Sequence, residues 1–254
     1  ISRQHITREI TSAGRSNLQI YNNEYLISVG SGLGTSTAGG GVPTDYKSHG
    51  YLGRLNYSYN DKYLLTLTGR VDEDSRFSEK YRVGFFPSVA VAWRIANEDF
   101  FDVSWISDLK LNASYGELGI VPLDSWDYTA FINISPRAIF GPDQIPHVGA
   151  TQAQLANPNL KWEERKIKNI GIDVGLLENR VSLSVEAYNS LSEDNLLRLP
   201  VAGYLGNLVA NPFINAGSIR NTGFEIAATY RNSSRELKWD VSLNVTTIKN
   251  KVED

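Results

Sequence analysis

The sequence contains neither cysteine nor methionine. Without cysteine there is no disulfide framework, no cysteine nucleophile and no thiolate metal site. Because even an initiating methionine is missing and no secretory signal opens the chain, we expect it to be part of a longer protein. The formal net charge of −3 gives no reason to expect a nucleic-acid partner.

Long hydrophobic runs are also missing. The longest uninterrupted apolar run is residues 89–93, whereas a transmembrane helix needs about 20 apolar residues. A transmembrane strand needs only ~9–11 residues with every second one apolar. Membrane-spanning strands therefore remain open for this chain of 254 residues, of which 41% are hydrophobic.

What the sequence does contain is period-two alternation of apolar and polar residues in segments of about ten residues, which predicts β-strands. The predicted strands are residues 51–60, 63–72, 85–95, 109–116, 170–176, 181–187, 224–230 and 237–245. No charged residue falls on their apolar faces, whereas the opposite faces carry many. This contrast favours an all-β protein whose apolar faces contact lipid, since a midplane Lys or Arg there costs roughly 2–4 kcal/mol.

The connections between these segments alternate in length. Short turns at residues 61–62, 178–179 and 232–236 contrast with long segments at 73–84, 117–168 and 189–221. Short turns on one edge and long loops on the other are typical of an outer-membrane β-barrel. Aromatic residues near the short turns predict an interfacial girdle: Tyr57, Tyr59, Tyr63, Trp93 and Trp239.

Two alternatives fit the same alternation. One is a complete small outer-membrane barrel of eight strands, acting as an adhesin or structural protein. The other is a secreted β-sandwich that binds carbohydrate, because the inner faces of sandwiches also alternate and use aromatic residues.

Residues 1–50 are less regular. A short strand is possible at 25–29, and the glycine-rich stretch 30–41 is predicted to be a flexible loop. The chain is therefore divided into a loop-rich segment, residues 1–50, and a region of barrel strands and loops, residues 51–254.

The sequence offers no catalytic constellation. His5, His49 and His147 have no ligand spacing, so no metal site is expected, and no cofactor motif is present. Within the long polar segment 117–168, three aromatic residues lie close together: Trp126, Tyr128 and Phe131. Aromatic rings on loops suit sugar rings or apolar ligands, so these three are the candidate substrate-binding residues.

Several ordered segments resemble the SusC/RagA family of TonB-dependent outer-membrane transporters. The likeness covers roughly residues 51–254. The matching blocks include residues 51–59 (YLGRLNYSY), 75–77 (SRF), 86–88 (FPS), 93–95 (WRI), 157–163 (NPNLKWE) and 221–225 (NTGFE). The sequence departs from the family pattern at residues 73–74 and 117–120, where strands pass into long loops.

The resemblance implies a section of a barrel of about 22 strands with long extracellular loops. It further implies uptake of oligosaccharides or peptides without covalent chemistry, a SusD-like surface lipoprotein as partner and TonB as the source of energy. The plug and the final strand of such a barrel are missing from this chain. In this scheme the outward faces meet outer-membrane lipid, and five polar residues face the lumen: Arg54, Arg70, Arg94, Asp173 and Glu225.

Overall fold

The computed structural model describes residues 1–8, 11–15, 20–21, 24–25, 36–40, 44–133, 137–142, 144–202, 204, 211–232 and 237–253. Within them, nine strands form one sheet in which every neighbouring pair is antiparallel. In spatial order these strands are β1 (Ser2–Arg8), β6 (Thr44–Tyr59), β7 (Tyr63–Asp74), β8 (Val83–Arg94), β9 (Ile106–Ile120), β14 (Glu163–Leu176), β15 (Val181–Glu193), β18 (Ser218–Asn232) and β19 (Trp239–Glu253).

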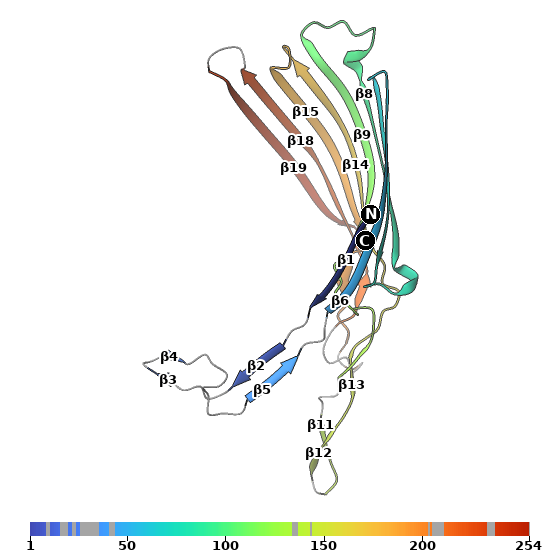
Figure 1. Ribbon diagram of the computed structural model, residues 1–254, viewed down its shortest axis with the longest axis vertical. Coiled ribbons are helices and arrows are strands. Elements are labelled where there is room, and N and C mark those ends of the chain that lie inside the picture. The colour runs from blue at the N-terminus through green and yellow to red at the C-terminus, as the bar shows by residue number, and fades with distance from the viewer. Residues whose placement is uncertain are drawn as a thin grey trace.

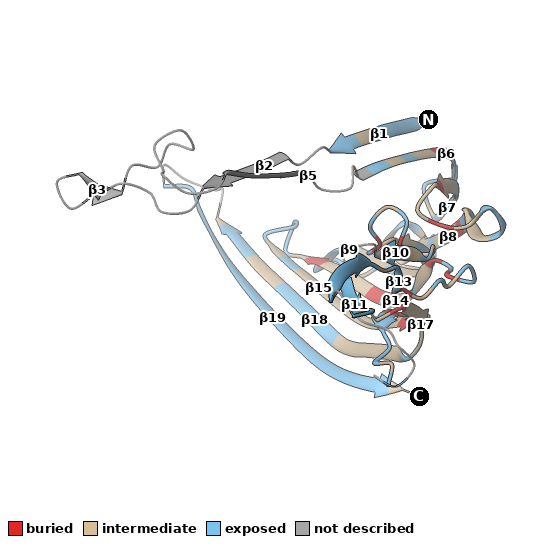
Figure 2. Ribbon diagram, turned by 90° about the horizontal axis from the view of Figure 1, so that it is seen from below, coloured by how far each residue is buried: buried red, intermediate tan, exposed pale blue. Residues whose placement is uncertain are grey.

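The sheet curves into an open arc rather than a closed cylinder (Figure 1; Figure 2). β1 and β19 are its two edge strands and do not pair with each other. The prediction of an antiparallel barrel section is confirmed, and all eight predicted strands are present, each longer than its sequence segment. The alternative of a complete small barrel is wrong for this chain, because the sheet does not close.

β1 was not predicted from the sequence. It pairs with β6 in continuous register, from Ser2 opposite Gly50 to Arg8 opposite Thr44. Its residues are almost all polar, so they give no alternating apolar signal, and the pairing comes from the neighbouring strand instead.

The rest of the first 50 residues also contains strands where loop was expected. β2 (Thr11–Arg15) pairs with β5 (Ser36–Gly40), so part of the glycine-rich stretch is extended. β3 (Ile20–Tyr21) pairs with β4 (Glu24–Tyr25). The predicted strand at 25–29 otherwise lies outside the described residues.

The two edges at which the strands begin and end, as distinct from the edge strands β1 and β19, differ as the sequence predicted. The upper edge in Figure 1 carries the shorter connections, including the segment after β8 with the 3-10 helix η2 (Ile95–Asn97). The β6–β7 turn is tight because Asn60 and Asp61 adopt φ values of 50° and 54°, which these residue types tolerate. The lower edge carries the long connections.

In the residues that the structure describes, these long connections contain η1 (Glu79–Tyr81) and three small two-stranded sheets. The sheets pair β10 (Phe131–Asn133) with β13 (Thr151–Gln154), β11 (Arg137–Phe140) with β12 (Ile145–Val148), and β16 (Leu196–Arg198) with β17 (Phe213–Asn215). No helix in the described part of the chain is long and apolar enough to cross a membrane.

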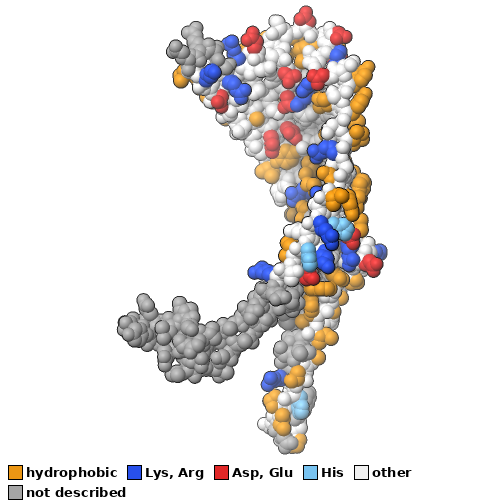
Figure 3. All heavy atoms as spheres, in the orientation of Figure 1, with side chains coloured by type: hydrophobic (Ala, Val, Ile, Leu, Met, Phe, Trp, Pro, Cys, Tyr) orange, Lys and Arg blue, Asp and Glu red, His pale blue; other side chains and the backbone are white. Residues whose placement is uncertain are grey.

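The two faces of the large sheet have opposite character. Hydrophobic side chains line its convex side and charged ones gather on its concave side (Figure 3). On the convex side Leu55, Ile170 and Leu243 are 59%, 64% and 64% exposed. No second sheet in the described part of the chain covers this apolar face. The β-sandwich alternative is therefore wrong, because a sandwich buries its apolar faces against each other.

The buried core lies near the long-loop edge. Among the described residues it contains Phe77, Phe86, Leu123, Leu160, Trp162 and Leu196. Except for Phe86 on β8 and Leu196 on β16, these residues belong to the connections between strands. The wall of the sheet has its apolar residues outside, so the core forms only where the long connections pack together.

Candidate ligand-binding site

An aromatic cluster fixes the base of the long connections. Phe77 and Trp162 have ring centroids 5.0 Å apart, and Phe86 lies 5.3 Å from Trp162 in an edge-to-face arrangement. A Cβ at Gly119 would lie 2.0 Å from Cζ of Phe86. The absence of a side chain at Gly119 therefore allows Phe86 to enter the cluster.

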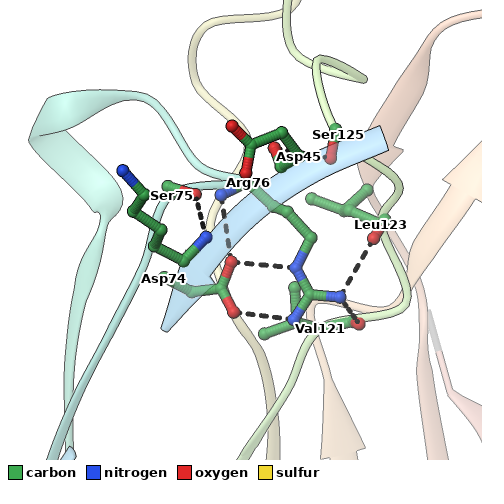
Figure 4. Close-up of polar contacts among 8 residues, drawn as sticks. Asp45, Asp74, Ser75, Arg76, Val121, Leu123 and Ser125 are labelled. Atoms are coloured by element: carbon green, nitrogen blue, oxygen red, sulfur yellow. Dashed lines mark hydrogen bonds and ion pairs between the residues drawn. The ribbon is translucent and has the colours of Figure 1, made fainter. Parts of the chain in front are cut away.

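A buried ion pair ties the β9–β10 connection to the end of β7. Asp74 accepts hydrogen bonds from Nε and Nη2 of Arg76 at 2.8 and 2.6 Å (Figure 4). Nη1 of Arg76 donates to the carbonyls of Val121 and Leu123 at 3.5 and 3.2 Å. Hydrogen bonding to Asp74 raises the pKa of Arg76 above its ordinary value. The guanidinium therefore stays charged and holds the start of the connection in place.

The same guanidinium also contacts β6. Its central carbon lies 4.2 Å from the ring centroid of Tyr46, a cation–π distance. Close by, the Ser125 hydroxyl donates to the carbonyl of Asp45 at 3.0 Å (Figure 4). The connection after β9 is thus fastened to strands β6 and β7, which precede it by many residues in the sequence.

Trp126 is held in an unusual backbone conformation. Its φ is +73°, a left-handed value that non-glycine residues adopt only at a cost in free energy. Its carbonyl accepts from both the backbone N–H and the hydroxyl of Thr129, at 2.9 and 2.8 Å. The residue as a whole is 45% exposed. This turn therefore presents a large aromatic ring to solvent.

Asp127 anchors the same turn from inside. Its carboxylate accepts from the backbone N–H of Asp124 at 2.7 Å, and its carbonyl accepts from Nε2 of Gln154 at 2.9 Å. Burial raises the pKa of Asp127 above that of an ordinary aspartate. The anchor connects the turn to β13, so the position of Trp126 depends on contacts within the loop structure.

Trp126 and Tyr128 line one pocket of about 200 Å³. The other lining residues are Asp45, Tyr46, Lys47, Ser75, Arg82 and Ser125. Nε of Arg82 is buried and has no hydrogen-bond partner. The pocket thus combines exposed aromatic surface with cationic and hydroxyl groups. Such a set can stack against a ring and donate hydrogen bonds to its oxygen atoms.

Phe131, the third predicted aromatic residue, does not line this pocket. It lies on β10, opposite Gln154 on β13. Sequence reasoning missed Lys47 and Arg82, which come from β6 and from the connection before β8, far from Trp126 in the chain. Only the three-dimensional packing brings them together, and ligand binding by these residues stays a prediction.

Asp173 anchors a polar network on the wall of the sheet. It accepts from the hydroxyl of Ser184 at 2.7 Å, from Nζ of Lys110 at 2.9 Å and from Nδ2 of Asn112 at 3.2 Å. The network spans β9, β14 and β15. It lies at the positions that alternate with the outward apolar residues, on the concave side.

The other four predicted lumen residues have different surroundings. Nε of Arg54 donates to the Thr68 hydroxyl at 3.2 Å. Arg70 pairs with Asp72 two residues away, and Glu225 lies directly opposite Glu186 on β15. Arg94 donates to Asp61 at 2.8 Å, so it joins the end of β8 to the β6–β7 turn at the short-turn edge. A lumen-facing role for these residues remains a prediction.

The short-turn edge contains a compact polar and aromatic cluster. Glu98 accepts from the Tyr63 hydroxyl at 2.7 Å, from Nε1 of Trp93 at 2.9 Å and from Nζ of Lys62 at 3.1 Å. These hydrogen bonds, that of Tyr63 first, lower the pKa of Glu98 below its ordinary value. Tyr63 and Trp93 stack with centroids 6.4 Å apart. Amphipathic aromatic rings near the ends of membrane-spanning strands are typical of a membrane–water interface.

Among the residues that the structure describes, no three His, Asp or Glu side chains converge to hold a metal ion.

The chain is similar to several proteins of known class. It is 36% identical over 203 residues to "TonB-dependent receptor P3" of Formosa agariphila. The aligned region covers 79% of this chain and 20% of that protein. It is 34% identical over 207 residues to "TonB-dependent receptor SusC" of Bacteroides thetaiotaomicron, covering 80% of this chain and 20% of that protein. The chain thus spans about a fifth of the length of these relatives.

A solved structure has the same fold. The RagAB peptide importer in its "open-open" state matches with a TM-score of 0.80 at 23% identity, over 99% of this chain and 27% of that chain. The sequence model described as "TonB dependent receptor-like, beta-barrel" matches residues 7–253. That match begins within β1, the edge strand that the alternation did not reveal. The chain belongs to the TonB-dependent receptor β-barrel family, whose members are outer-membrane proteins.

Proposed function

We propose that this chain is a wall section of an outer-membrane transporter that imports oligosaccharides or peptides. The observation that carries the proposal is the separation of surfaces on one sheet. Its convex face is apolar and uncovered, its concave face is polar, and its long connections lie on one edge only. A section of transport barrel needs these three surfaces to meet lipid, lumen and extracellular ligand.

The proposal includes two partners and no chemistry on the ligand. A SusD-like lipoprotein would cover the long-loop edge, and TonB would act through parts of the protein beyond this chain. The relative named SusC and the solved RagAB importer support this assignment by similarity. No covalent step is proposed, because the sequence offers no catalytic constellation.

Ligand contact is proposed at the pocket of Trp126 and Tyr128. The rings would stack on a sugar or on an apolar side chain of a peptide, while Lys47 and Arg82 would donate hydrogen bonds. Truncation of an aromatic side chain that stacks on a ligand should weaken binding by roughly 1–3 kcal/mol, or about 5- to 150-fold.

The test uses the full-length protein in its native outer membrane. Uptake of labelled oligosaccharides and of labelled peptides is measured with and without dissipation of the proton gradient across the inner membrane. We expect energy-dependent uptake of one ligand class, reduced by Trp126→Ala and by Tyr128→Ala. The matched control is Phe131→Ala, which removes an aromatic ring of the same loop outside the pocket. Energy-independent uptake, or equal losses for all three variants, would contradict the proposal.

A further inference from the structure

Basic side chains form two rows across strands β14, β15, β18 and β19. Residues that lie directly opposite each other on neighbouring strands point to the same face. The first row is Lys168, Asn189, Thr222 and Lys249, and the second is Lys166, Leu191, Arg220 and Lys251. We call the five cations of these rows the basic patch: Lys166, Lys168, Arg220, Lys249 and Lys251.

The basic patch directly borders the outward apolar surface. Lys168 lies two residues before Ile170 on β14, so both side chains are on the convex face. On β18 and β19, Arg220 and Lys249 are likewise an even number of residues from Phe224 and Val245. Ile170, Phe224 and Val245 are 64%, 59% and 45% exposed. On each strand the patch lies on the long-loop side of these apolar residues.

Carboxylates follow immediately beyond the cations, toward the long-loop edge. Lys166 pairs with Glu193, and Arg220 pairs with Glu253 at 2.9 Å through two of its nitrogen atoms. Asn189 accepts a further hydrogen bond from Arg220 at 3.1 Å. The second row is therefore positioned by its acidic neighbours.

The lysines of the first row differ from the cations of the second row in their ion pairing. Lys168 and Lys249 are exposed and have no ion pair with any described residue. They are the two cations that lie nearest to the apolar surface. Lysine side chains can lay their apolar stems along such a surface and place the ammonium group at the level of lipid headgroups.

We propose that the basic patch binds phosphate groups of lipid headgroups in the outer leaflet of the membrane. The inference rests on the proposed function for its orientation, because the long loops of such barrels are extracellular. Two unpaired ammonium groups in one row, with an amide and a hydroxyl between them, match the negative charge and the acceptor oxygens of phosphate. Continuity with the apolar surface identifies the occupant as a lipid.

The experiment uses the purified full-length protein in a non-ionic detergent. Binding is measured by native mass spectrometry with three probes: lipid A bearing its phosphates, the same lipid after phosphatase treatment, and inorganic pyrophosphate. The test variant is Lys168→Gln with Lys249→Gln. The matched control, Lys80→Gln with Lys238→Gln, removes two exposed lysines that are outside the two rows.

We expect the test variant to bind the phosphorylated lipid about 30-fold more weakly, since each lysine near an anionic lipid surface contributes about a factor of five. The control variant should bind it as the wild type does, and the phosphatase-treated lipid should not distinguish the proteins. Equal affinity of wild type and test variant, or an equal loss in the control, would overturn the inference. Pyrophosphate binding as tight as that of the lipid would also overturn it.

The outcome is separable from that of the transport proposal. The basic patch faces lipid, so ligand uptake by the test variant should match that of the wild type. Lipid binding without any uptake by the wild type would contradict the transport proposal and leave this inference intact.

Discussion

The Asp74–Arg76 ion pair offers a quantitative test of how the loop that contains Trp126 is held. Asp74 is 2% exposed, and its carboxylate receives two hydrogen bonds from the Arg76 guanidinium. Hydrogen bonds that involve charged groups each contribute about 1.5–3 kcal/mol, and removal of one partner leaves the other charge poorly solvated. We therefore expect a coupling energy of about 3 kcal/mol between the two side chains.

The assay is a double-mutant cycle with Asp74→Asn, Arg76→Gln and the double variant, each in the full-length protein. Hydrogen exchange of residues 121–129 reports local opening of the turn that contains Trp126. Each single variant should raise the opening constant by roughly 150-fold, which corresponds to about 3 kcal/mol. The double variant should add little to either, because the interaction is already lost.

A coupling energy below about 0.5 kcal/mol would refute this reasoning, since that is the range of pairs without mutual contact. Increased exchange across β7 itself would also count against it. The ion pair lies at the end of that strand, and the strand ladder should remain protected.

Three further predictions concern other parts of the sheet. Because hydrogen bonds lower the pKa of Glu98, its contribution to stability is complete above the ordinary carboxyl pKa and is lost as the pH falls through the lowered value. Glu98→Gln should therefore reduce the acid dependence of thermal unfolding between about pH 5 and pH 3, and an unchanged dependence would contradict this. Gly119→Ala should destabilise the full-length protein by about 1–3 kcal/mol in urea unfolding through its clash with Phe86. The control Gly53→Ala should have little effect, as no atom lies within 4 Å of its new Cβ. Residues 1–254 alone should not form a heat-resistant, protease-protected species in detergent or lipid, because the open edges at β1 and β19 leave backbone groups unpaired in hydrocarbon.

The strands of the wall could be predicted because each carries its own signal. Alternation with period two is a local property of the sequence. The apolar face of each strand faces an apolar environment along its whole length, so the alternation continues from end to end. β1 shows the limit of this reasoning. Its single apolar residue, Ile6, cannot define a period, and the place of β1 in the sheet is set by pairing with β6.

The loop structure could be predicted only in part. Three aromatic residues in a polar segment were predicted to contact ligand. Two of them line one pocket, and ligand contact stays a prediction. The buried core of the loops gave none, because Phe77, Leu123 and Trp162 belong to different connections and have no common period. Arg82 illustrates the same difficulty, since only tertiary packing brings it to the pocket that Trp126 lines.

The juxtaposition of Glu186 and Glu225 bears on what fills the concave side. These residues lie directly opposite each other on β15 and β18, and like charges in this relation destabilise a sheet. In a dry interior the cost would be several kcal/mol, because neither carboxylate has an ion pair with a described residue. Water screens the repulsion to a small value. The repulsion is therefore small where water reaches the concave face, as it would along a water-filled lumen.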